Sequence, residues 1–277
     1  MMRSASRQSL DALLDKEREV FGGRISAATL TTLSGELYAI ADLLVRQPRL
    51  RRTLGDPAAS AQRRSDLLEQ LLSGKVEKHT LTLATTAVGL RWSTPWDLTD
   101  ALEDAGDEAL FAAAEKDRKL DTVEDELFRF ERIMQSESSA VALLDDAVAD
   151  ADRRNALLDE LLSEKVNAVT LALLHHAVAS TRKRSVLLAV DDLLDKAAVR
   201  QERSIARVVS AVALTDAQQQ RLEAALTDMY GRTISVRTAV DPEVRGGLVV
   251  RVGDEVIDGS IATRLAQARS TIGGQSN

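Results

Sequence analysis

Cysteine is absent from this chain of 277 residues, which excludes disulfides and thiolate metal sites and is typical of a cytosolic protein. Aromatic residues make up only 3%, so Ala and Leu supply most of the apolar side chains, which favours closely packed helices. No segment approaches the roughly 18 to 20 uninterrupted apolar residues that cross a bilayer. The N-terminus also lacks the apolar core of a signal peptide. We therefore expect a cytoplasmic protein that reaches a membrane only through a partner.

The motifs of catalysis are missing as well. We find no GxxxxGK[ST] phosphate loop, no GxSxG elbow and no HExxH pair. His175 and His176 are neighbours on a predicted helix and point about 100° apart, so they cannot share a metal ion; with His79, we interpret them as structural. These absences predict no enzyme activity, no cofactor and no metal site.

Charge is moderate and acidic. Charged residues make up 29% and hydrophobic residues 44%, which is typical of a globular protein, and the net charge is −7. Binding to nucleic acid requires a basic face, so we expect none. Asp191, Asp192 and Asp195 lie near Lys196 on a predicted helix, and we interpret this group as a solvated charged face rather than a metal site.

An internal repeat with an offset of 90 residues dominates the chain. Residues 63–88 match residues 153–178 at 14 of 26 positions without a gap, where chance would give about three. The same offset aligns the amphipathic stripe Leu33, Leu37, Ile40 and Leu44 with Val123, Leu127, Phe130 and Met134. We infer a duplicated bundle of about five or six helices.

Within each copy, the helices near 77–90 and 167–180 are apolar or small on nearly all sides, which predicts a place at the centre of each bundle. Residues 95–119 connect the copies, and Pro95 suits the start of a helix. Trp92 and Trp96 are expected to pack at this junction, with a partner-binding hot spot as the alternative.

From Arg203 the pattern changes to strands. Residues 204–214 and 232–240 are strand-like, and between them Thr215 and Gln218 form a capping box that opens a helix ending near Gly231. Residues 248–258 predict a hairpin that turns at Gly253 and Asp254, and a last helix is expected after Ser260. The fold class is therefore mainly α, with two tandem helical bundles (1–100 and 101–202) followed by a small β-α-β-β-α module (203–277).

The run from Val240 to Ser260 resembles the signature of the F-type ATP synthase delta subunit family, which includes the mitochondrial oligomycin-sensitivity-conferral protein. The matching elements are a D-P, a G-G, an apolar strand, a G-D and an I-D-G-S, and residues from about 105 to 272 follow the usual length of the family. The signature residues, which we interpret as structural, are Asp241, Gly246, Gly247, Gly253, Asp254, Asp258 and Ser260. The additional N-terminal copy resembles the long form found in actinobacteria.

The resemblance implies a non-catalytic peripheral-stalk subunit on the cytoplasmic face of the cell membrane, which links the stalk to the catalytic head and resists rotation of the head. In this family a groove between the first and fifth helices holds the N-terminal helix of an alpha subunit, and the C-terminal module contacts the C-terminal end of b-type stalk subunits. The matching helices here are 107–118 and 167–180. The implied lining residues are Leu110, Phe111, Ala114, Leu171 and Leu174, and the alternative is that they fill the bundle core.

The first copy differs at the equivalent helices. Gly22 and Gly23 replace alanines, and Thr82, Thr85 and Thr86 stand where the second copy has Ala172, His175 and His176. We infer a different partner for it, either stalk helices or another alpha subunit, and expect that deletion of residues 1–100 leaves the rest folded. A helical regulatory or RNA-binding protein is the competing function, and the acidic charge and the C-terminal signature argue against it.

Overall fold

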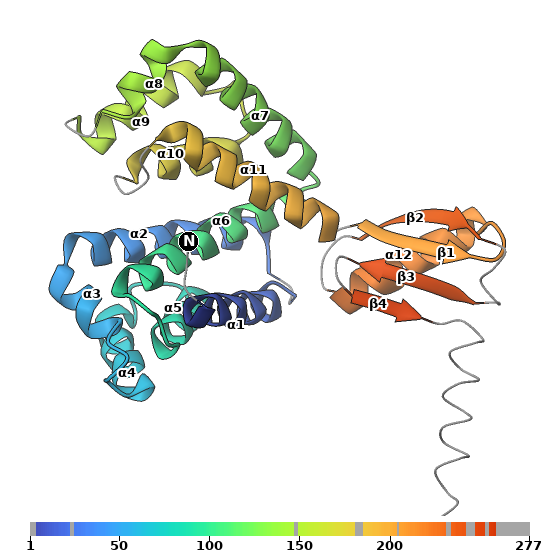
Figure 1. Ribbon diagram of the computed structural model, residues 1–277, viewed down its shortest axis with the longest axis horizontal. Helices are drawn as coiled ribbons and strands as arrows, with labels where there is room; N and C mark the ends of the chain where they lie inside the picture. Colours follow the sequence, from blue (N-terminus) through green and yellow to red (C-terminus); the bar gives the residue numbers. More distant parts are fainter. Residues whose placement is uncertain are drawn as a thin grey trace, which may run out of the picture. The chain divides into compact units, whose positions relative to one another are not determined.

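The computed structural model describes residues 4–22, 25–146, 149–180, 185–203, 205–230, 234–241, 247–252 and 255–258. Two compact units divide the chain, Met1–Ala197 and Ala198–Asn277. The first is helical and the second is an α/β module (Figure 1), so the predicted fold class is confirmed. No helix in these ranges has the length and apolar character needed to span a membrane.

Eleven described helices make up the helical part of the chain. They are α1 (Ser4–Phe21), α2 (Ala27–Arg46), α3 (Pro48–Leu54), α4 (Ala61–Leu72), α5 (Lys78–Gly89), α6 (Pro95–Lys116), α7 (Leu120–Ser136), α8 (Ser138–Leu144), α9 (Ala151–Leu162), α10 (Ala168–Ala179) and α11 (Val186–Arg203).

The predicted duplication is visible in the helix bounds. Adding 90 to the bounds of α3, α4 and α5 gives 138–144, 151–162 and 168–179, which are the bounds of α8, α9 and α10. The same shift places α1 over α6 (94–111 against 95–116), and it places α6 over α11 (185–206 against 186–203). Helix α6 is therefore both the last helix of the first repeat and the first helix of the second.

Equivalent side chains make equivalent contacts in the two repeats. The Glu36 carboxylate accepts hydrogen bonds from the Glu77 backbone N–H and the Thr80 hydroxyl, at the start of α5. Ninety residues later, Glu126 accepts them from the Asn167 N–H and the Thr170 hydroxyl, at the start of α10. Both carboxylates thus satisfy amide groups that a helix N-terminus leaves without intrahelical partners.

A buried arginine is repeated in the same way. Arg64 donates to the Leu54 carbonyl and Arg154 to the Leu144 carbonyl, each at 3.4 Å. Each guanidinium thus satisfies a carbonyl at the C-terminal end of α3 or α8, and the two copies share their cores and their end contacts.

Helix α6 occupies the centre of the helical unit. A capping box between Thr94 and Asp97 fixes its start, and Pro95 stands in its first turn as predicted. Fifteen of its 22 residues are buried, against five of 12 in α10. One face, including Leu98, belongs to the first hydrophobic core, and another, including Phe111, belongs to the second.

This arrangement corrects the position predicted for the helices at 77–90 and 167–180. Helices α5 and α10 each bury a single stripe, namely Thr80, Leu83, Ala84, Ala87 and Val88, and Thr170, Leu173, Leu174, Ala177 and Val178. Their other leucines and valines are half-buried, because α6 takes the central position between the repeats.

The two tryptophans differ in environment. Trp92 is buried in the first core and its indole N–H donates to the Ala87 carbonyl at 2.8 Å. Trp96 is 40% exposed, and the Arg51 guanidinium lies 3.5 Å from its ring centroid. Trp92 therefore packs inside the first repeat and not at the predicted junction between the copies, and a role of Trp96 as a partner-binding hot spot stays a prediction.

The second unit is a four-stranded sheet with one described helix. Its elements are β1 (Ile205–Ser210), α12 (Asp216–Tyr230), β2 (Ser235–Val240), β3 (Leu248–Val252) and β4 (Glu255–Asp258), in the sheet order β2-β1-β3-β4. β1 and β2 are parallel, which α12 permits as the crossover, and the other pairs are antiparallel. Strands β1 and β2 are shorter than predicted, and the helix expected after Ser260 lies outside the described residues.

Candidate partner-binding site

The helices predicted to form a groove, α6 and α10, lie against each other in the second repeat. Leu110, Phe111, Ala114 and Leu174 are each at most 1% exposed and belong to the second core, while Leu171 is half-buried. The structure brings the four buried residues together in the core role that was the alternative. Contact of these five residues with a partner stays a prediction.

A tyrosine from the first repeat lies on α6 and α10. Tyr38, on α2, stacks on the imidazole of His176 on α10, with 3.6 Å between ring centroids and 6° between ring planes. Its hydroxyl donates to a carboxylate oxygen of Asp107 on α6 at 2.6 Å. Burial, reinforced by the Asp107 charge, raises the pKa of Tyr38 well above its ordinary value, so the hydroxyl stays a donor.

A glycine makes this close approach possible. A Cβ on Gly106 would overlap the Tyr38 ring. Tyr38 therefore packs against the second core although it belongs to the first repeat. A structural role for His176 was predicted from the sequence, but its partner could not be, because Tyr38 and His176 are 138 positions apart.

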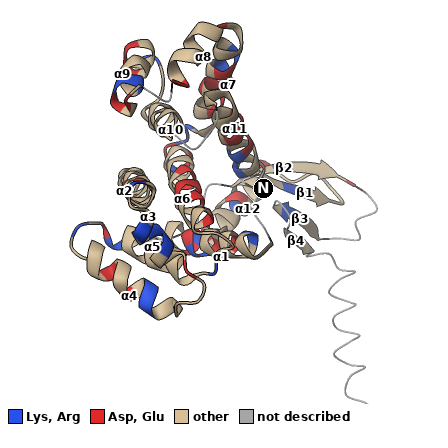
Figure 2. Ribbon diagram, turned by 60° about the vertical axis from the view of Figure 1, so that its left-hand side comes forward, with Lys and Arg blue, Asp and Glu red and all other residues tan. Residues whose placement is uncertain are grey.

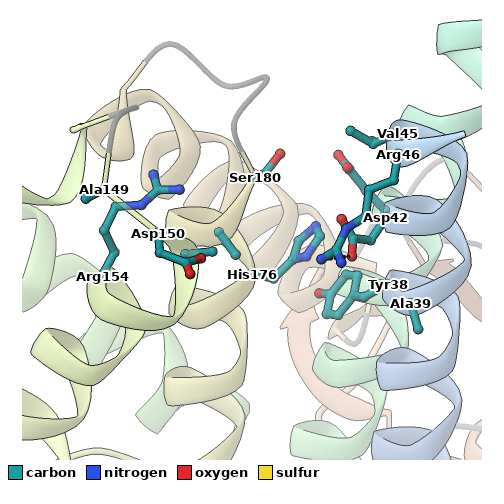
Figure 3. A pocket seen from close by; sticks show the side chains of 13 residues that line it. Tyr38, Ala39, Asp42, Val45, Arg46, Ala149, Asp150, Arg154, His176 and Ser180 are labelled. Atoms are coloured by element: carbon teal, nitrogen blue, oxygen red, sulfur yellow. Dashed lines mark ion pairs between the residues drawn. The ribbon is translucent and has the colours of Figure 1, made fainter. Parts of the chain in front are cut away.

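A cavity of about 510 Å³ opens beside this stacked pair (Figure 3). It lies between α2, α6, α9 and α10, and its lining carries charges of both signs: Tyr38, Ala39, Asp42, Val45, Arg46, Glu103, Ala149, Asp150, Ala151, Arg154, His176, Ala179 and Ser180. Asp42 and Arg46 form an ion pair of 2.6 Å within α2. The mixed charge favours contact with a protein surface over binding of a small ion of one sign.

Asp107, which accepts the Tyr38 hydroxyl, belongs to a cluster of three carboxylates and one ammonium group. Lys196 on α11 contacts Asp104 at 2.6 Å and Asp107 at 2.7 Å on α6, and Asp192 at 2.9 Å on its own helix. Figure 2 shows acidic residues along α6. Although the three carboxylates are close enough to share a metal ion, the ammonium group already binds each of them.

The pKa values in this cluster follow from burial and from the paired charges. Burial raises the pKa of Asp104 above its ordinary value, although Lys196 opposes the rise. Burial alone would lower the pKa of Lys196, but the charges of Asp107, Asp104 and Asp192 outweigh it and hold that pKa well above its usual range. Asp191, Asp192 and Asp195 are exposed, as predicted, whereas the neighbouring Lys196 is only 21% exposed and contacts α6.

The remaining charged candidates form ordinary surface contacts. The imidazole of His175 lies 2.9 Å from Asp159 on α9, where both side chains are partly exposed.

The hydroxyls of Thr82, Thr85 and Thr86 each donate to the carbonyl four residues earlier in α5. The threonines of the first repeat therefore satisfy their polar groups within their own helix.

The signature residues of the second unit lie at the ends of strands. The Asp241 N–H donates to the Ser210 carbonyl at 2.9 Å, and Asp258 pairs with Val249 across the predicted hairpin. Gly247 has a φ of +86°, a conformation that favours glycine. Gly246, Gly253, Asp254 and Ser260 lie outside the described residues. Strands β3 and β4 pair as the predicted hairpin requires, and the structural role of the signature residues stays a prediction.

Comparison with known proteins shows similarity to one protein family. The family model described as ATP synthase delta (OSCP) subunit matches residues 107–272. A protein of Salinispora arenicola named ATP synthase subunit delta is 41% identical over 273 residues, which cover 98% of this chain and 99% of that protein. One of Streptomyces avermitilis with the same name is 42% identical, covering 96% and 94%.

A third relative has a longer chain. The ATP synthase subunit b-delta of Mycobacterium sp. (strain KMS) is 40% identical over 271 residues, which cover 98% of this chain and 61% of that protein. The likeness to these relatives therefore includes helices α1 to α5 of the first repeat, which lie outside the family model.

Proposed function

Since this chain belongs to the ATP synthase delta (OSCP) subunit family, we propose that it is a non-catalytic peripheral-stalk subunit of the proton-translocating F-type ATP synthase. In this role it links the stalk of the membrane sector to the catalytic head and resists rotation of the head. The observation that carries the proposal is the end-to-end likeness to relatives named as delta subunits.

Two separate units suit a link between two partners. The helical unit, Met1–Ala197, would bind the N-terminal helix of an alpha subunit, and the α/β unit would bind the C-terminal end of a b-type stalk subunit. Once one unit is bound, the second contact becomes intramolecular, so two modest affinities combine into a firm attachment. The protein would lie at the cytoplasmic face of the membrane and be held there by the complex.

The described residues offer protein-binding surfaces rather than reactive groups. The one cluster with a metal-like arrangement of ligands is held by Lys196. The α/β unit exposes apolar side chains suited to a partner, including Val212 at 72% and Met229 at 67%.

Purification from membranes tests the proposal. The full chain with an affinity tag should bring down both alpha and b subunits when membranes are solubilised in mild detergent. Recovery of neither would overturn the proposed function, and recovery of nucleic acid or unrelated regulators in their place would favour the competing class.

A further inference from the structure

We propose that α2 of the first repeat occupies the face that α6 and α10 of the second repeat would offer to a partner helix. Tyr38 is the side chain that holds it there. The contact would be autoinhibitory for this face, because an external helix could bind between α6 and α10 only after α2 had moved away. This consequence for a partner rests on the proposed function, whereas the occupancy itself does not.

The contacts of Tyr38 are those of an inserted side chain. Its ring has His176 on one side and the backbone of Gly106 close by, and its hydroxyl reaches Asp107. A stacked aromatic pair and a hydrogen bond to a buried carboxylate are each stabilising, and together they fix one orientation of the ring. Two helices of the second repeat therefore hold one residue of the first.

Beyond the tyrosine, α2 and α10 face each other across the cavity. Ala39, Asp42 and Val45 follow Tyr38 on the side of α2 that lines the cavity (Figure 3). Ala179 and Ser180 line the same cavity from the C-terminal end of α10. Helix α2 thus packs along α6 and reaches α10 through the stacked ring of Tyr38, with the cavity between the two helices beyond that point.

Comparison of the two repeats shows why a side chain of the first repeat packs on the second and the equivalent side chain of the second does not pack on the first. With the offset of 90 residues, Lys16 and Thr86 stand where the second repeat has Gly106 and His176. The first repeat therefore lacks both the glycine that admits the ring and the imidazole that stacks on it. Phe128, which stands at the position of Tyr38, is 51% exposed.

The histidine ring of His176 reports on this contact directly. The chain has three histidines, so ¹³C-histidine labelling gives three ring signals, and His176→Gln assigns the one of interest. Stacking on Tyr38 should shift the His176 ring protons upfield. Tyr38→Leu should abolish the shift and Tyr38→Phe should retain it, while Phe128→Leu, the matched change in the second repeat, should leave it unaltered.

A synthetic peptide of the alpha N-terminus from the same organism then tests the consequence. The peptide should bind between α6 and α10 of the full chain only with loss of the upfield shift, because α2 must leave this face first. A shift retained in a complex whose peptide contacts α6 and α10, or a shift absent from the free protein, would overturn the inference. A persistent shift with no peptide binding anywhere would support the occupancy of the face and count against the proposed alpha contact.

Discussion

Lys196 is the residue at which charged side chains of α6 and α11 meet. Its ammonium group contacts two aspartates of α6 and one of α11, and Asp107 also accepts the Tyr38 hydroxyl. Asp107 is therefore shared between a tyrosine of the first repeat and a lysine of the second. This side-chain network, with the shared helix, couples the repeats.

Lys196→Met should destabilise the helical unit. The substitution leaves Asp104 and Asp107 near each other without their cation. Removing one partner of a fully buried ion pair costs roughly 3–5 kcal/mol, and we expect about 2–4 kcal/mol here because Lys196 is partly exposed and Asp104 can take up a proton. Urea unfolding at pH 7, followed by circular dichroism, measures the change.

Arg129→Met provides the matched control. It removes a cation from an i,i+4 pair with Asp125 on α7, where the two side chains are 72% and 53% exposed. Exposed pairs contribute about 1 kcal/mol or less. Equal effects of the two substitutions would show that the Lys196 cluster is no more than a surface feature.

At the scale of elements, α6 serves both repeats, as the last helix of the first and the first helix of the second. The sequence allowed the duplication, the helices and the hairpin to be predicted, because repeated side chains and strand alternation are local patterns. Residues 95–119 were predicted as a connection, since burial on two opposite faces leaves no simple period in the sequence. The pairing of α2 with α6 and α10 could not be predicted either, because Tyr38 and His176 are far apart along the chain.

Gly106→Ala tests the close approach of α2 to α6. An alanine Cβ would overlap the Tyr38 ring, which His176 and Asp107 hold in place. Overpacking of this kind costs about 1–3 kcal/mol, against a gain of roughly 0.5–1 kcal/mol from replacing a helical glycine. We therefore expect a lower free energy of unfolding and a weaker upfield shift of the His176 ring.

Gly35→Ala on α2 is the matched change without the overlap. Nothing lies within 4 Å of a Cβ at this position, so only the helical gain of roughly 0.5–1 kcal/mol should remain. Thermal unfolding of the two variants side by side measures the difference. Stabilisation by both alanines would mean that α2 does not approach α6 at Gly106.

At the scale of the whole molecule, the shared helix decides which parts of the chain can be removed. All residues of the first and second cores lie within 1–197, and those of the third core lie in the α/β unit. The first two cores share α6, so the two repeats depend on each other. The division into domains at residue 100 stays a prediction, and the shared helix argues against independent folding of the two parts.

Removal of the α/β unit and removal of residues 1–100 should therefore affect the stability of the remaining chain differently. A chain ending at Arg203 keeps both helical cores and should unfold with a urea midpoint close to that of the helical unit in the full chain. A chain that lacks residues 1–100 uncovers the face of α6 that carries Leu102, Ala105 and Ala109, together with the Tyr38 site on α10. This changes the expectation, formed from the repeat alone, that the remainder would fold undisturbed.

For the shortened chain we expect a lower urea midpoint and concentration-dependent association in sedimentation velocity, because a contiguous apolar face becomes exposed. Leu102→Gln should reduce the association in the shortened chain. In the full chain the same substitution should destabilise, since Leu102 is fully buried there. Less association in the shortened chain, together with lower stability in the full chain, would distinguish an exposed apolar face of α6 from a general folding defect. A monomeric shortened chain with an unchanged midpoint would show that α6 does not need the first repeat, and would restore the repeats as independent bundles.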